Sequence, residues 1–193
     1  RQSSMNQSSM VLQSINPATG ELLAELLCAT AEEVQAAVEA ARAAQKPWAR
    51  LAPVERARFL WRFRDELFAC RRPFAELITR ENGKPLAEAL VAELLVTLDV
   101  AAYYARQGPA MLRPERVPHS NPVAWAKRGK LHFEPLGVIG LITPWNYPLS
   151  IPAGQAIAAL AAGNAVVLKP SELTPLAALE LAKVWQRAGL PEG

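Results

Sequence analysis

One uncharged stretch constrains the fold of this chain more than any other feature. From Leu136 to Leu168 there are 33 consecutive residues without a charged side chain. A run of that length could span a bilayer, but three prolines, two asparagines and a glutamine interrupt it. It divides into two short apolar runs, 137–142 and 165–168, separated by a turn and a segment of helix length. Such runs are typical of buried parallel strands, so we expect a strand–helix–strand unit rather than a membrane-spanning helix.

The same alternation continues to the end of the chain. A helix is predicted over about 151–162 after the first run, and another over about 175–188 after the second. Parallel strands joined through a helix have a right-handed crossover, so the predicted fold class is α/β. In open α/β sheets, ligands bind just beyond the carboxyl ends of the strands. The segments that follow the two strands, 142–148 and 169–172, are therefore the candidate site.

A hairpin and four helices are predicted upstream of this unit. Residues 14–23 carry the turn chemistry of a strand–turn–strand element. The first helix is capped by Thr30 and ends before Pro47, because Glu33 completes a capping box and proline disfavours a helix interior. The second helix is expected to start at Pro53. The third is expected to run from Pro73 to Asn82, and the fourth from Pro85 to Gly108–Pro109. Leu60, Phe63 and Leu67 recur at i, i+3 and i+7, so the helix that starts at Pro53 packs on a core. Leu86, Leu90, Leu94 and Leu98 are predicted to share one face of the last.

Two other segments differ in character from the helices. Residues 1–10 are polar and are predicted to be a disordered tail or upstream extension. Residues 113–133 mix valine and tryptophan with arginine, lysine and proline. This mixture indicates extended, partly exposed strands that form an arm able to pair with another chain or domain.

The charge balance excludes some classes of function. The 193 residues are 51% hydrophobic and 20% charged, which is typical of a globular protein rather than a disordered one. A net charge of +3 does not indicate a nucleic-acid binder. Arginines gather at Arg56, Arg58, Arg62 and Arg64, but acidic residues are interleaved. A solvated helix face is therefore favoured over an anion-binding patch.

The chain has two cysteines, Cys28 and Cys70. They are far apart and lack CxxC spacing, so no metal site is predicted. A disulfide stays open as an alternative, although two lone cysteines fit a reducing cytoplasm better. Arg71 and Arg72 could lower the pKa of the Cys70 thiol. A structural role is nevertheless favoured for both cysteines.

Asn146 lies between Pro144 and Pro148 in the first candidate segment. An asparagine between prolines is usually a turn former. The functional interpretation is an oxyanion donor, an amide aimed at the place where negative charge develops in a reaction. The position after a buried strand favours the second interpretation without deciding it. Trp145 is more typical of a packing residue than of a cofactor contact.

Lys169 and Glu172 follow the second strand. Lys169 is either a solvated strand end or a side chain that reaches a ribose or phosphate. Glu172 could bind ribose hydroxyls and disfavour a 2′-phosphate, which favours NAD over NADP, or it could lie in the first turn of a helix. The glycine fingerprint of dinucleotide-binding proteins is missing, because Gly137 and Gly140 are only a fragment of it inside the strand.

Four motifs, in order along the chain, resemble the aldehyde dehydrogenase superfamily. They are residues 16–20, 80–85, 133–148 and 162–175. The likeness runs from about residue 11 to the end of the chain and corresponds to the N-terminal portion of the family. It implies the N-terminal hairpin and helices of an NAD-binding domain over 11–112, an oligomerisation β-arm over 113–133, and the first βαβα of a Rossmann-like sheet over 134–193.

The resemblance also implies a chemistry. In the family, a cysteine thiolate attacks the aldehyde to form a thiohemiacetal, hydride passes to the nicotinamide, and a water activated by a glutamate hydrolyses the thioester. Asn146 matches the residue that stabilises the oxyanion, and Lys169, Ser171 and Glu172 match the adenosine-ribose site. The implied cofactor is NAD, with NADP as the alternative, and no metal. The implied cofactor-binding residues are Ile142, Thr143, Pro144, Trp145, Asn146, Lys169, Pro170, Ser171 and Glu172.

One departure from the family pattern is large. The family's nucleophilic cysteine and general-base glutamate lie beyond the position of Gly193, and neither Cys28 nor Cys70 matches the nucleophile motif. We therefore expect the N-terminal piece of an enzyme that oxidises an aldehyde to a carboxylic acid, inactive without its other part. The whole enzyme is expected to be cytoplasmic and a homo-oligomer, a dimer or tetramer, with no nucleic-acid or membrane partner. Two alternatives stay open, namely an inactive nucleotide-binding or interaction module, and a relative that reduces acyl phosphates or acyl-CoA.

Overall fold

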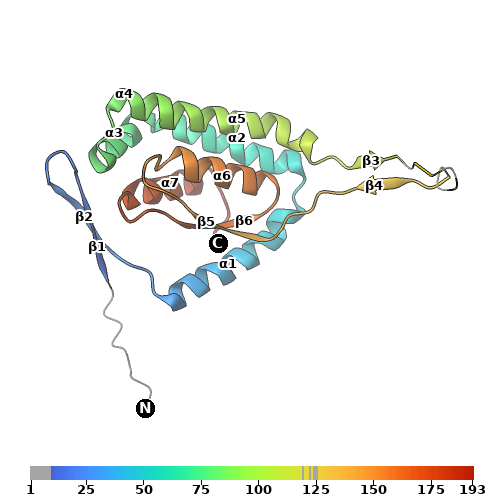
Figure 1. Ribbon diagram of the computed structural model, residues 1–193, viewed down its shortest axis with the longest axis horizontal. Helices are drawn as coiled ribbons and strands as arrows, with labels where there is room; N and C mark the ends of the chain where they lie inside the picture. The colour runs from blue at the N-terminus through green and yellow to red at the C-terminus, as the bar shows by residue number, and fades with distance from the viewer. Residues whose placement is uncertain (1–9, 119, 122, 124–125) are drawn as a thin grey trace, which may run out of the picture.

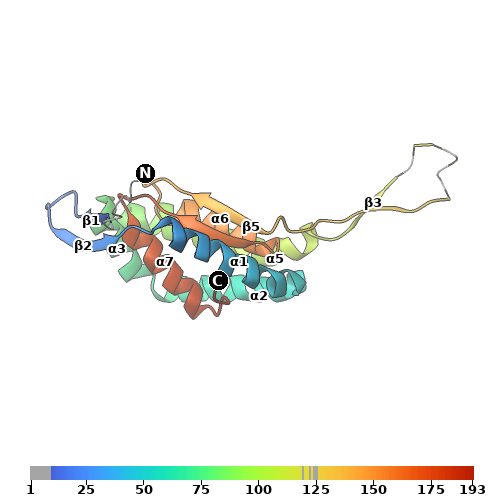
Figure 2. The ribbon, with the colours of Figure 1, turned by 90° about the horizontal axis from the view of Figure 1, so that it is seen from below.

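The computed structural model describes residues 10–118, 120–121, 123 and 126–193. It forms a body of packed helices around a small parallel sheet, from which a long two-stranded arm projects (Figures 1 and 2). No helix within the described ranges is long and apolar enough to cross a membrane. The tail expected over residues 1–10 lies outside the described residues, apart from Met10. The Met10 carbonyl accepts a hydrogen bond of 2.9 Å from the Cys28 N–H, so Met10 belongs to the hairpin.

The parallel sheet has the predicted α/β topology. Strand β5 (Val138–Ile142) leads to helix α6 (Ser150–Ala161), strand β6 (Ala165–Lys169) and helix α7 (Pro175–Arg187). The register is unbroken from the Val138–Ala165 pair to the Ile142–Lys169 pair. Asn164 fixes the other end of the sheet, because its side-chain oxygen accepts a 2.9 Å hydrogen bond from the Gly137 N–H. The α/β fold class predicted from the two apolar runs is confirmed.

Helix α2 (Pro53–Ala69) supplies the centre of the hydrophobic core. Leu60, Phe63 and Leu67 are buried, as their helical spacing predicts. Phe63 stacks on Trp185 of α7 with ring centroids 3.6 Å apart, which joins the helical layer to the βαβα unit. Burial of each such side chain contributes about 1.5–3 kcal/mol. The core therefore spans the two halves of the chain rather than forming one core in each.

Helix α1 (Ala31–Arg50) begins as predicted and ends later than predicted. Thr30 and Glu33 form the expected reciprocal capping box. The expected end before Pro47 is wrong, because the helix continues one turn beyond it. Contacts from other elements hold that last turn. The Trp48 indole donates to the Leu160 carbonyl at 3.0 Å, and Trp48 is buried.

The next helical segments also differ in detail from their expected bounds. Helix α3 (Arg71–Asn82) starts two residues before Pro73 and ends, as predicted, at Gly83, whose φ of 79° is left-handed. The following helix is not a single regular element. It consists of α4 (Leu86–Glu88), a π-helical segment η1 (Ala89–Leu95) and α5 (Val96–Met111).

The π-helical segment changes which side chains face the core. Of the four leucines predicted to share one face, Leu94 is fully buried and Leu86, Leu90 and Leu98 are only partly buried. Glu93 is buried beside Leu94. The expected end at Gly108–Pro109 is wrong, because α5 continues to Met111. Gly108 is buried at a close approach to α6, where an added Cβ would lie 3.9 Å from the Ala161 Cβ.

Two antiparallel pairs lie outside the helical body. Strands β1 (Val11–Ile15) and β2 (Leu22–Leu27) form the predicted N-terminal hairpin. Strands β3 (Glu115–Val117) and β4 (Gly129–Leu131) pair midway along the projecting arm (Figure 1). Residues 119, 122 and 124–125, which belong to the segment predicted as an arm, lie outside the described residues.

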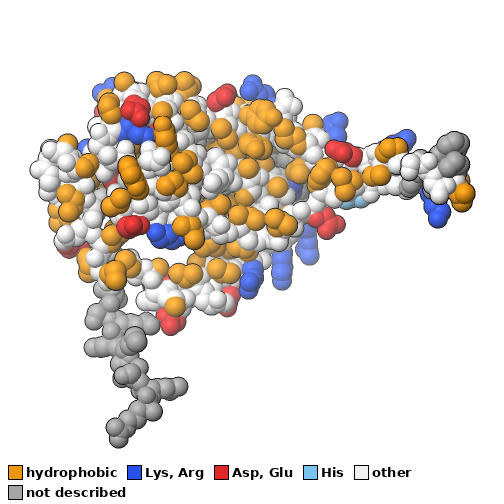
Figure 3. All heavy atoms as spheres, in the orientation of Figure 1, with side chains coloured by type: hydrophobic (Ala, Val, Ile, Leu, Met, Phe, Trp, Pro, Cys, Tyr) orange, Lys and Arg blue, Asp and Glu red, His pale blue; other side chains and the backbone are white. Residues whose placement is uncertain are grey.

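The arginine cluster does not form the solvated face that was predicted for all four residues. Arg58 is exposed, but Arg56 is 5% exposed, and its guanidinium donates to the carbonyls of Ala49, Leu51 and Ala161. Burial lowers the pKa of Arg56 from its ordinary value. Exposed basic side chains gather instead along α1, over the lower edge of the face in Figure 3. They are Arg42, Lys46 and Arg50.

Candidate functional site

The two predicted segments meet at one edge of the parallel sheet. Ile142 and Lys169 are the last register pair of β5 and β6. One residue further on, the Thr143 N–H donates to the Lys169 carbonyl at 3.2 Å. The chain then turns away from each strand. The segment 143–148 (the amide turn) and the segment 169–174 (the cofactor turn) therefore start side by side at the carboxyl end of the sheet.

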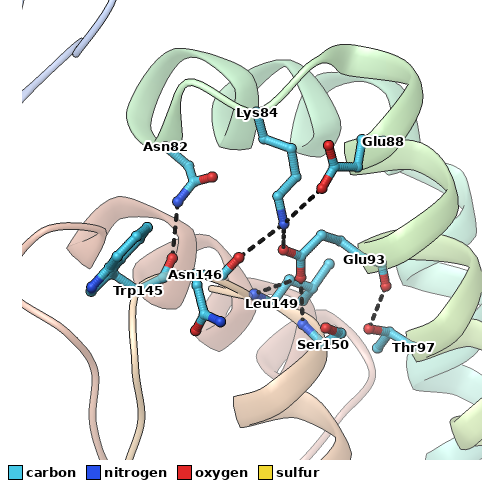
Figure 4. Close-up of polar contacts among 9 residues, drawn as sticks. All are labelled: Asn82, Lys84, Glu88, Glu93, Thr97, Trp145, Asn146, Leu149 and Ser150. Atoms are coloured by element: carbon cyan, nitrogen blue, oxygen red, sulfur yellow. Dashed lines mark hydrogen bonds and ion pairs between the residues drawn. The ribbon is translucent and has the colours of Figure 1, made fainter.

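The backbone of the amide turn is held from the end of α3 and from Lys84, two residues beyond that helix. The Asn82 side-chain amide donates to the Trp145 carbonyl at 2.9 Å, and the Lys84 ammonium donates to the Asn146 carbonyl at 3.0 Å (Figure 4). Both bonds use backbone oxygens. Within the described residues, the side-chain amide of Asn146 is exposed and makes no hydrogen bond, so it is available to a ligand.

Lys84 is itself held by a buried carboxylate. Its ammonium lies 2.6 Å from Glu93 Oε1, and the Glu93 side chain has no exposed surface. The other oxygen of Glu93 accepts the N–H groups of Leu149 and Ser150, at 3.2 and 2.8 Å, where α6 begins (Figure 4). The ammonium also lies 4.0 Å from the Tyr147 ring centroid, a cation–π contact. Each charge is therefore compensated, as a buried ion pair requires.

The cofactor turn presents its charges to solvent. Lys169 and Glu172 form an ion pair of 3.2 Å, and each side chain is 63% exposed. The pKa of the Glu172 carboxyl is lowered, first by a hydrogen bond from its own backbone N–H and then by Lys169, so Glu172 is ionised at neutral pH. Ser171 is buried, and its hydroxyl accepts the Leu173 N–H at 3.2 Å. It shapes the turn instead of facing outward with the two charged residues.

The other predicted site residues divide between surface and interior. Ile142 and Trp145 are 83% and 52% exposed at the edge of the sheet, and Pro144 between them is also exposed. Thr143 is buried and Pro170 is half-buried. An open apolar and aromatic surface thus lies beside the Asn146 amide. Such a surface suits the flat ring of a bound nucleotide.

Helix α7, which follows the cofactor turn, is capped by a residue from α3. Glu81 is 3% exposed, and its carboxylate accepts the N–H groups of Leu176 and Ala177 at 2.7 and 2.8 Å. The Ser14 hydroxyl also donates to it at 3.0 Å. Burial raises the pKa of Glu81, and these hydrogen bonds partly oppose that rise. A carboxylate at this place satisfies the free N–H groups of the helix and complements its dipole.

Comparison with known proteins gives a consistent result. The model of the aldehyde dehydrogenase family matches residues 4–193. The chain belongs to the aldehyde dehydrogenase family. It is 42% identical over 183 residues to a betaine aldehyde dehydrogenase of Rhizobium leguminosarum bv. trifolii (strain WSM2304), an alignment that covers 95% of this chain and 37% of the relative. The resemblance predicted from the four motifs is confirmed.

Solved structures agree with the family and with the fold. An E. coli NADP-dependent enzyme matches with a TM-score of 0.88 and 35% identity, over 95% of this chain and 37% of that one. An NAD-dependent benzaldehyde dehydrogenase from Corynebacterium glutamicum matches with a TM-score of 0.86 and 30% identity, over 95% and 39%. The chain thus spans less than two fifths of the length of the family members it matches. These two relatives differ in cofactor, so the family admits both NAD and NADP.

Four polar residues that hold the candidate site had no role assigned from the sequence. They are Glu81, Asn82, Lys84 and Glu93. The first three lie in the motif at 80–85, which carried the resemblance without a stated function. Glu93 had a signal of its own, because it is an acidic residue within an apolar helical run, and such a residue is buried only with a partner. Which partner it would find depends on the fold, since Leu149 and Ser150 are more than 50 residues away.

Neither cysteine of this family member is arranged as a nucleophile. Cys28 and Cys70 are free thiols. The expectation that Arg71 and Arg72 lower the pKa of Cys70 is wrong. Burial raises that pKa, and Arg187, whose guanidinium lies 3.6 Å from the sulfur, opposes the rise only partly. Arg71 instead bonds the Phe68 carbonyl. Within the described ranges, no cluster of His, Cys, Asp or Glu could hold a metal ion.

An apolar hollow elsewhere on the molecule is not part of the site. It has a volume of 420 Å³ and lies along β6 between α1 and α7. Its walls include Trp48, Leu160, Leu181 and Trp185. Asn146, Lys169 and Glu172 do not line it. The candidate site is therefore the carboxyl edge of the sheet and not this hollow.

Proposed function

We propose that this chain contributes the oxyanion donor and part of the dinucleotide site to an enzyme that oxidises an aldehyde to a carboxylic acid with NAD or NADP. Family membership supports the reaction class. The observation that carries the proposal is the juxtaposition of the two turns, through the Ile142–Lys169 register pair and the Thr143–Lys169 hydrogen bond. Ligands of open α/β sheets bind at such an edge.

Asn146 is the proposed donor to the oxygen of the substrate. Attack on an aldehyde carbonyl places negative charge on that oxygen, and a fixed N–H donor stabilises it because the donor needs no reorganisation during the reaction. Asn146 suits this task since its backbone is held by Lys84 while its side-chain amide stays exposed. The nucleophile and the base are proposed to be the family's cysteine and glutamate, which this chain does not supply.

The cofactor turn is proposed to hold the ribose end of the dinucleotide. When bound, the nicotinamide accepts a hydride from the substrate. The exposed charges of Lys169 and Glu172 offer one cation and one carboxylate to hydroxyl and phosphate groups. The ionised Glu172 would bind ribose hydroxyls and repel a 2′-phosphate, which favours NAD, while Lys169 would moderate that preference. Ser171 acts by shaping the turn.

The remaining assignments follow from the same proposal. Residues 11–112 and 134–193 form parts of one dinucleotide-binding domain, and 113–133 form an arm through which whole enzymes associate as dimers or tetramers. Two free cysteines support a reducing, cytoplasmic location. The chain by itself is expected to bind dinucleotide and to oxidise no aldehyde, because it supplies no activated thiol.

Calorimetric titration of the purified chain with NAD and with NADP tests the proposal. We expect binding of both, tighter for NAD, and a smaller difference between them in Glu172→Ser. Glu76→Ser is the matched control, because Glu76 is also an exposed carboxylate in an ion pair, and it should leave both affinities unchanged. A folded chain that binds neither dinucleotide at millimolar concentration would exclude the cofactor assignment. Steady aldehyde oxidation by the chain alone would exclude the assignment of the nucleophile to another part of the enzyme.

A further inference from the structure

The end of α3 contacts both sides of the candidate site. We propose that residues 81–84 form a positioning clamp, which fixes the amide turn through Asn82 and Lys84 and the start of α7 through Glu81. The clamp rests on the proposed function, because it acts on the residues to which that function assigns chemistry. None of its side chains is proposed to touch substrate or cofactor. Its members are positioning residues.

On one side, the clamp acts on two successive carbonyls. Asn82 bonds the Trp145 oxygen at 2.9 Å, and Lys84 bonds the Asn146 oxygen at 3.0 Å (Figure 4). Two adjacent peptide units held in this way fix both backbone dihedrals of Asn146. The direction of its side chain is then set by the turn, and its amide remains free for a ligand. A misplacement of about 1 Å can cost on the order of 10²-fold in rate, so such a constraint has catalytic value.

Lys84 extends the clamp to the first turn of α6. Its partner Glu93 bonds the N–H groups of Leu149 and Ser150. The amide turn is thus fixed before Asn146, at Asn146 and after it. The three contacts come from the end of α3, from the residue after Gly83 and from the π-helical segment, which are next to one another in sequence.

On the other side, the clamp fixes the element behind the cofactor turn. Glu81 accepts the N–H groups of Leu176 and Ala177, the second and third residues of α7. The cofactor turn is therefore tied at one end by the sheet and at the other end by Glu81. Lys169 and Glu172 stay exposed between these two fixed points.

Gly83 makes the two-sided arrangement feasible. Its φ of 79° reverses the chain, so that Glu81 lies on the helix before the reversal and Lys84 on the segment after it. A Cβ at this position would lie 3.0 Å from Pro17 Cγ and would also be strained at this φ. A substitution at Gly83 should therefore disturb both sides of the clamp together.

Amide hydrogen exchange of the full chain, followed by NMR, tests the clamp. The reporters are the amides of Leu149 and Ser150 on one side and of Leu176 and Ala177 on the other. Asn82→Ala should speed exchange at the first pair by roughly 2–10-fold, the effect of losing one hydrogen bond. Glu81→Gln should speed exchange at the amides of Leu176 and Ala177, and Gly83→Ala should speed exchange at all four reporter amides.

Gln45→Ala is the matched control for Asn82→Ala. Its amide also donates to the carbonyl of a distant turn, that of Gly163, at 3.1 Å. It should leave both reporter pairs unchanged relative to the Phe63 amide in the core. Unchanged exchange at Leu149 and Ser150 in a folded Asn82→Ala chain would overturn the clamp. An equal increase at the Phe63 amide would also overturn it, because the effect would then be global.

Kinetics separate a failure of the clamp from a failure of the proposed function. In an enzyme that joins this chain to the family's catalytic thiol, Asn82→Ala should lower kcat several-fold and leave the KM for dinucleotide unchanged. Asn82→Gln, which keeps an amide donor, should recover part of the loss. If Asn146→Ala leaves kcat unchanged, the oxyanion role fails while the exchange result still stands. If Asn146→Ala lowers kcat and Asn82→Ala does not, the clamp fails alone.

Discussion

The amide turn and the cofactor turn leave the same edge of one sheet, and they are built in opposite ways. The amide turn is held at its carbonyls by Asn82 and Lys84, and Lys84 is paired with Glu93, a carboxylate with no exposed surface. The cofactor turn carries its lysine and glutamate on the outside, each 63% exposed. The Lys84–Glu93 pair holds a backbone in place, and the Lys169–Glu172 pair faces solvent.

This difference matches two kinds of task. A donor that stabilises developing charge is effective only if its position is fixed beforehand. A surface that binds a large, flexible cofactor and releases it needs charges that exchange water readily. Exposed ion pairs of this kind contribute little to the free energy of folding. Removal of one partner from a buried pair, by contrast, destabilises the protein strongly. The following experiments test that contrast, starting with the largest expected effect.

Removal of the buried carboxylate should have the largest effect. Glu93→Ala leaves the buried Lys84 ammonium with only the half-exposed Glu88, at 4.0 Å, and removes the acceptor of two N–H groups at the start of α6. We expect the free energy of unfolding to fall by about 3–5 kcal/mol, measured by urea denaturation. Glu76→Ala breaks the exposed Arg72–Glu76 pair and should cost about 0.3–0.5 kcal/mol. Equal losses in the two variants would contradict the contrast between buried and exposed pairs.

Removal of the donor should affect catalysis and not folding. Asn146→Ala, in an enzyme that also carries the catalytic thiol, should lower kcat by about 10²–10³-fold, the usual effect of one oxyanion donor. Its urea midpoint should not move, because within the described residues the amide makes no contact that folding requires. Asn121→Ala, an exposed asparagine at the arm, is the control. An unchanged kcat, with chemistry rate-limiting, would remove Asn146 from the mechanism.

The pH dependence of stability should report on Glu81. Its pKa is raised in the folded protein above the ordinary value of 4.5, because burial favours the protonated carboxyl. Its contribution is therefore fully present below that value and is lost as the pH rises through the raised pKa. The melting temperature of the wild type relative to Glu81→Gln should fall as the pH rises from 4.5. If the melting temperature of the wild type relative to Glu81→Gln instead rises with pH, the hydrogen bonds from α7 lower the pKa of Glu81 more than burial raises it.

The smallest effect is expected at the exposed pair. Glu172→Ser should shift the ratio of KM values for NADP and NAD a few-fold toward NADP, with kcat for NAD and the melting temperature unchanged. Steady-state kinetics with both cofactors measure that ratio in the enzyme that carries the thiol. A ratio that does not move would show that Glu172 faces solvent without binding the ribose.

The strands and the two turns were predictable because their signals are local. Short apolar runs that end at Ile142 and just before Lys169 give the parallel sheet and its edge, and Gly83 gives the end of α3. The contacts that hold the site were not predictable. Leu176 and Ala177 for Glu81, Ala161 for Arg56, and Leu149 and Ser150 for Glu93 are partners far away in the sequence, and they become neighbours only after the helices pack. For the same reason Pro47 lies inside a helix, since tertiary contacts outweigh the local preference of proline.

The capping of α7 by Glu81, across 95 residues of sequence, has a consequence for engineering this protein. Residues 134–193 cannot be excised or transplanted as an independent cassette, because groups outside that segment satisfy its helix ends. Glu81 accepts N–H groups at the start of α7, and Glu93 accepts N–H groups at the start of α6. Arg56 donates to a carbonyl at the end of α6. A chimera with another family member should exchange residues 11–193 as one block, because Ser14, Gln45 and Trp48 also bond groups later in the chain. A junction within the arm would leave buried N–H and C=O groups unpaired on both sides.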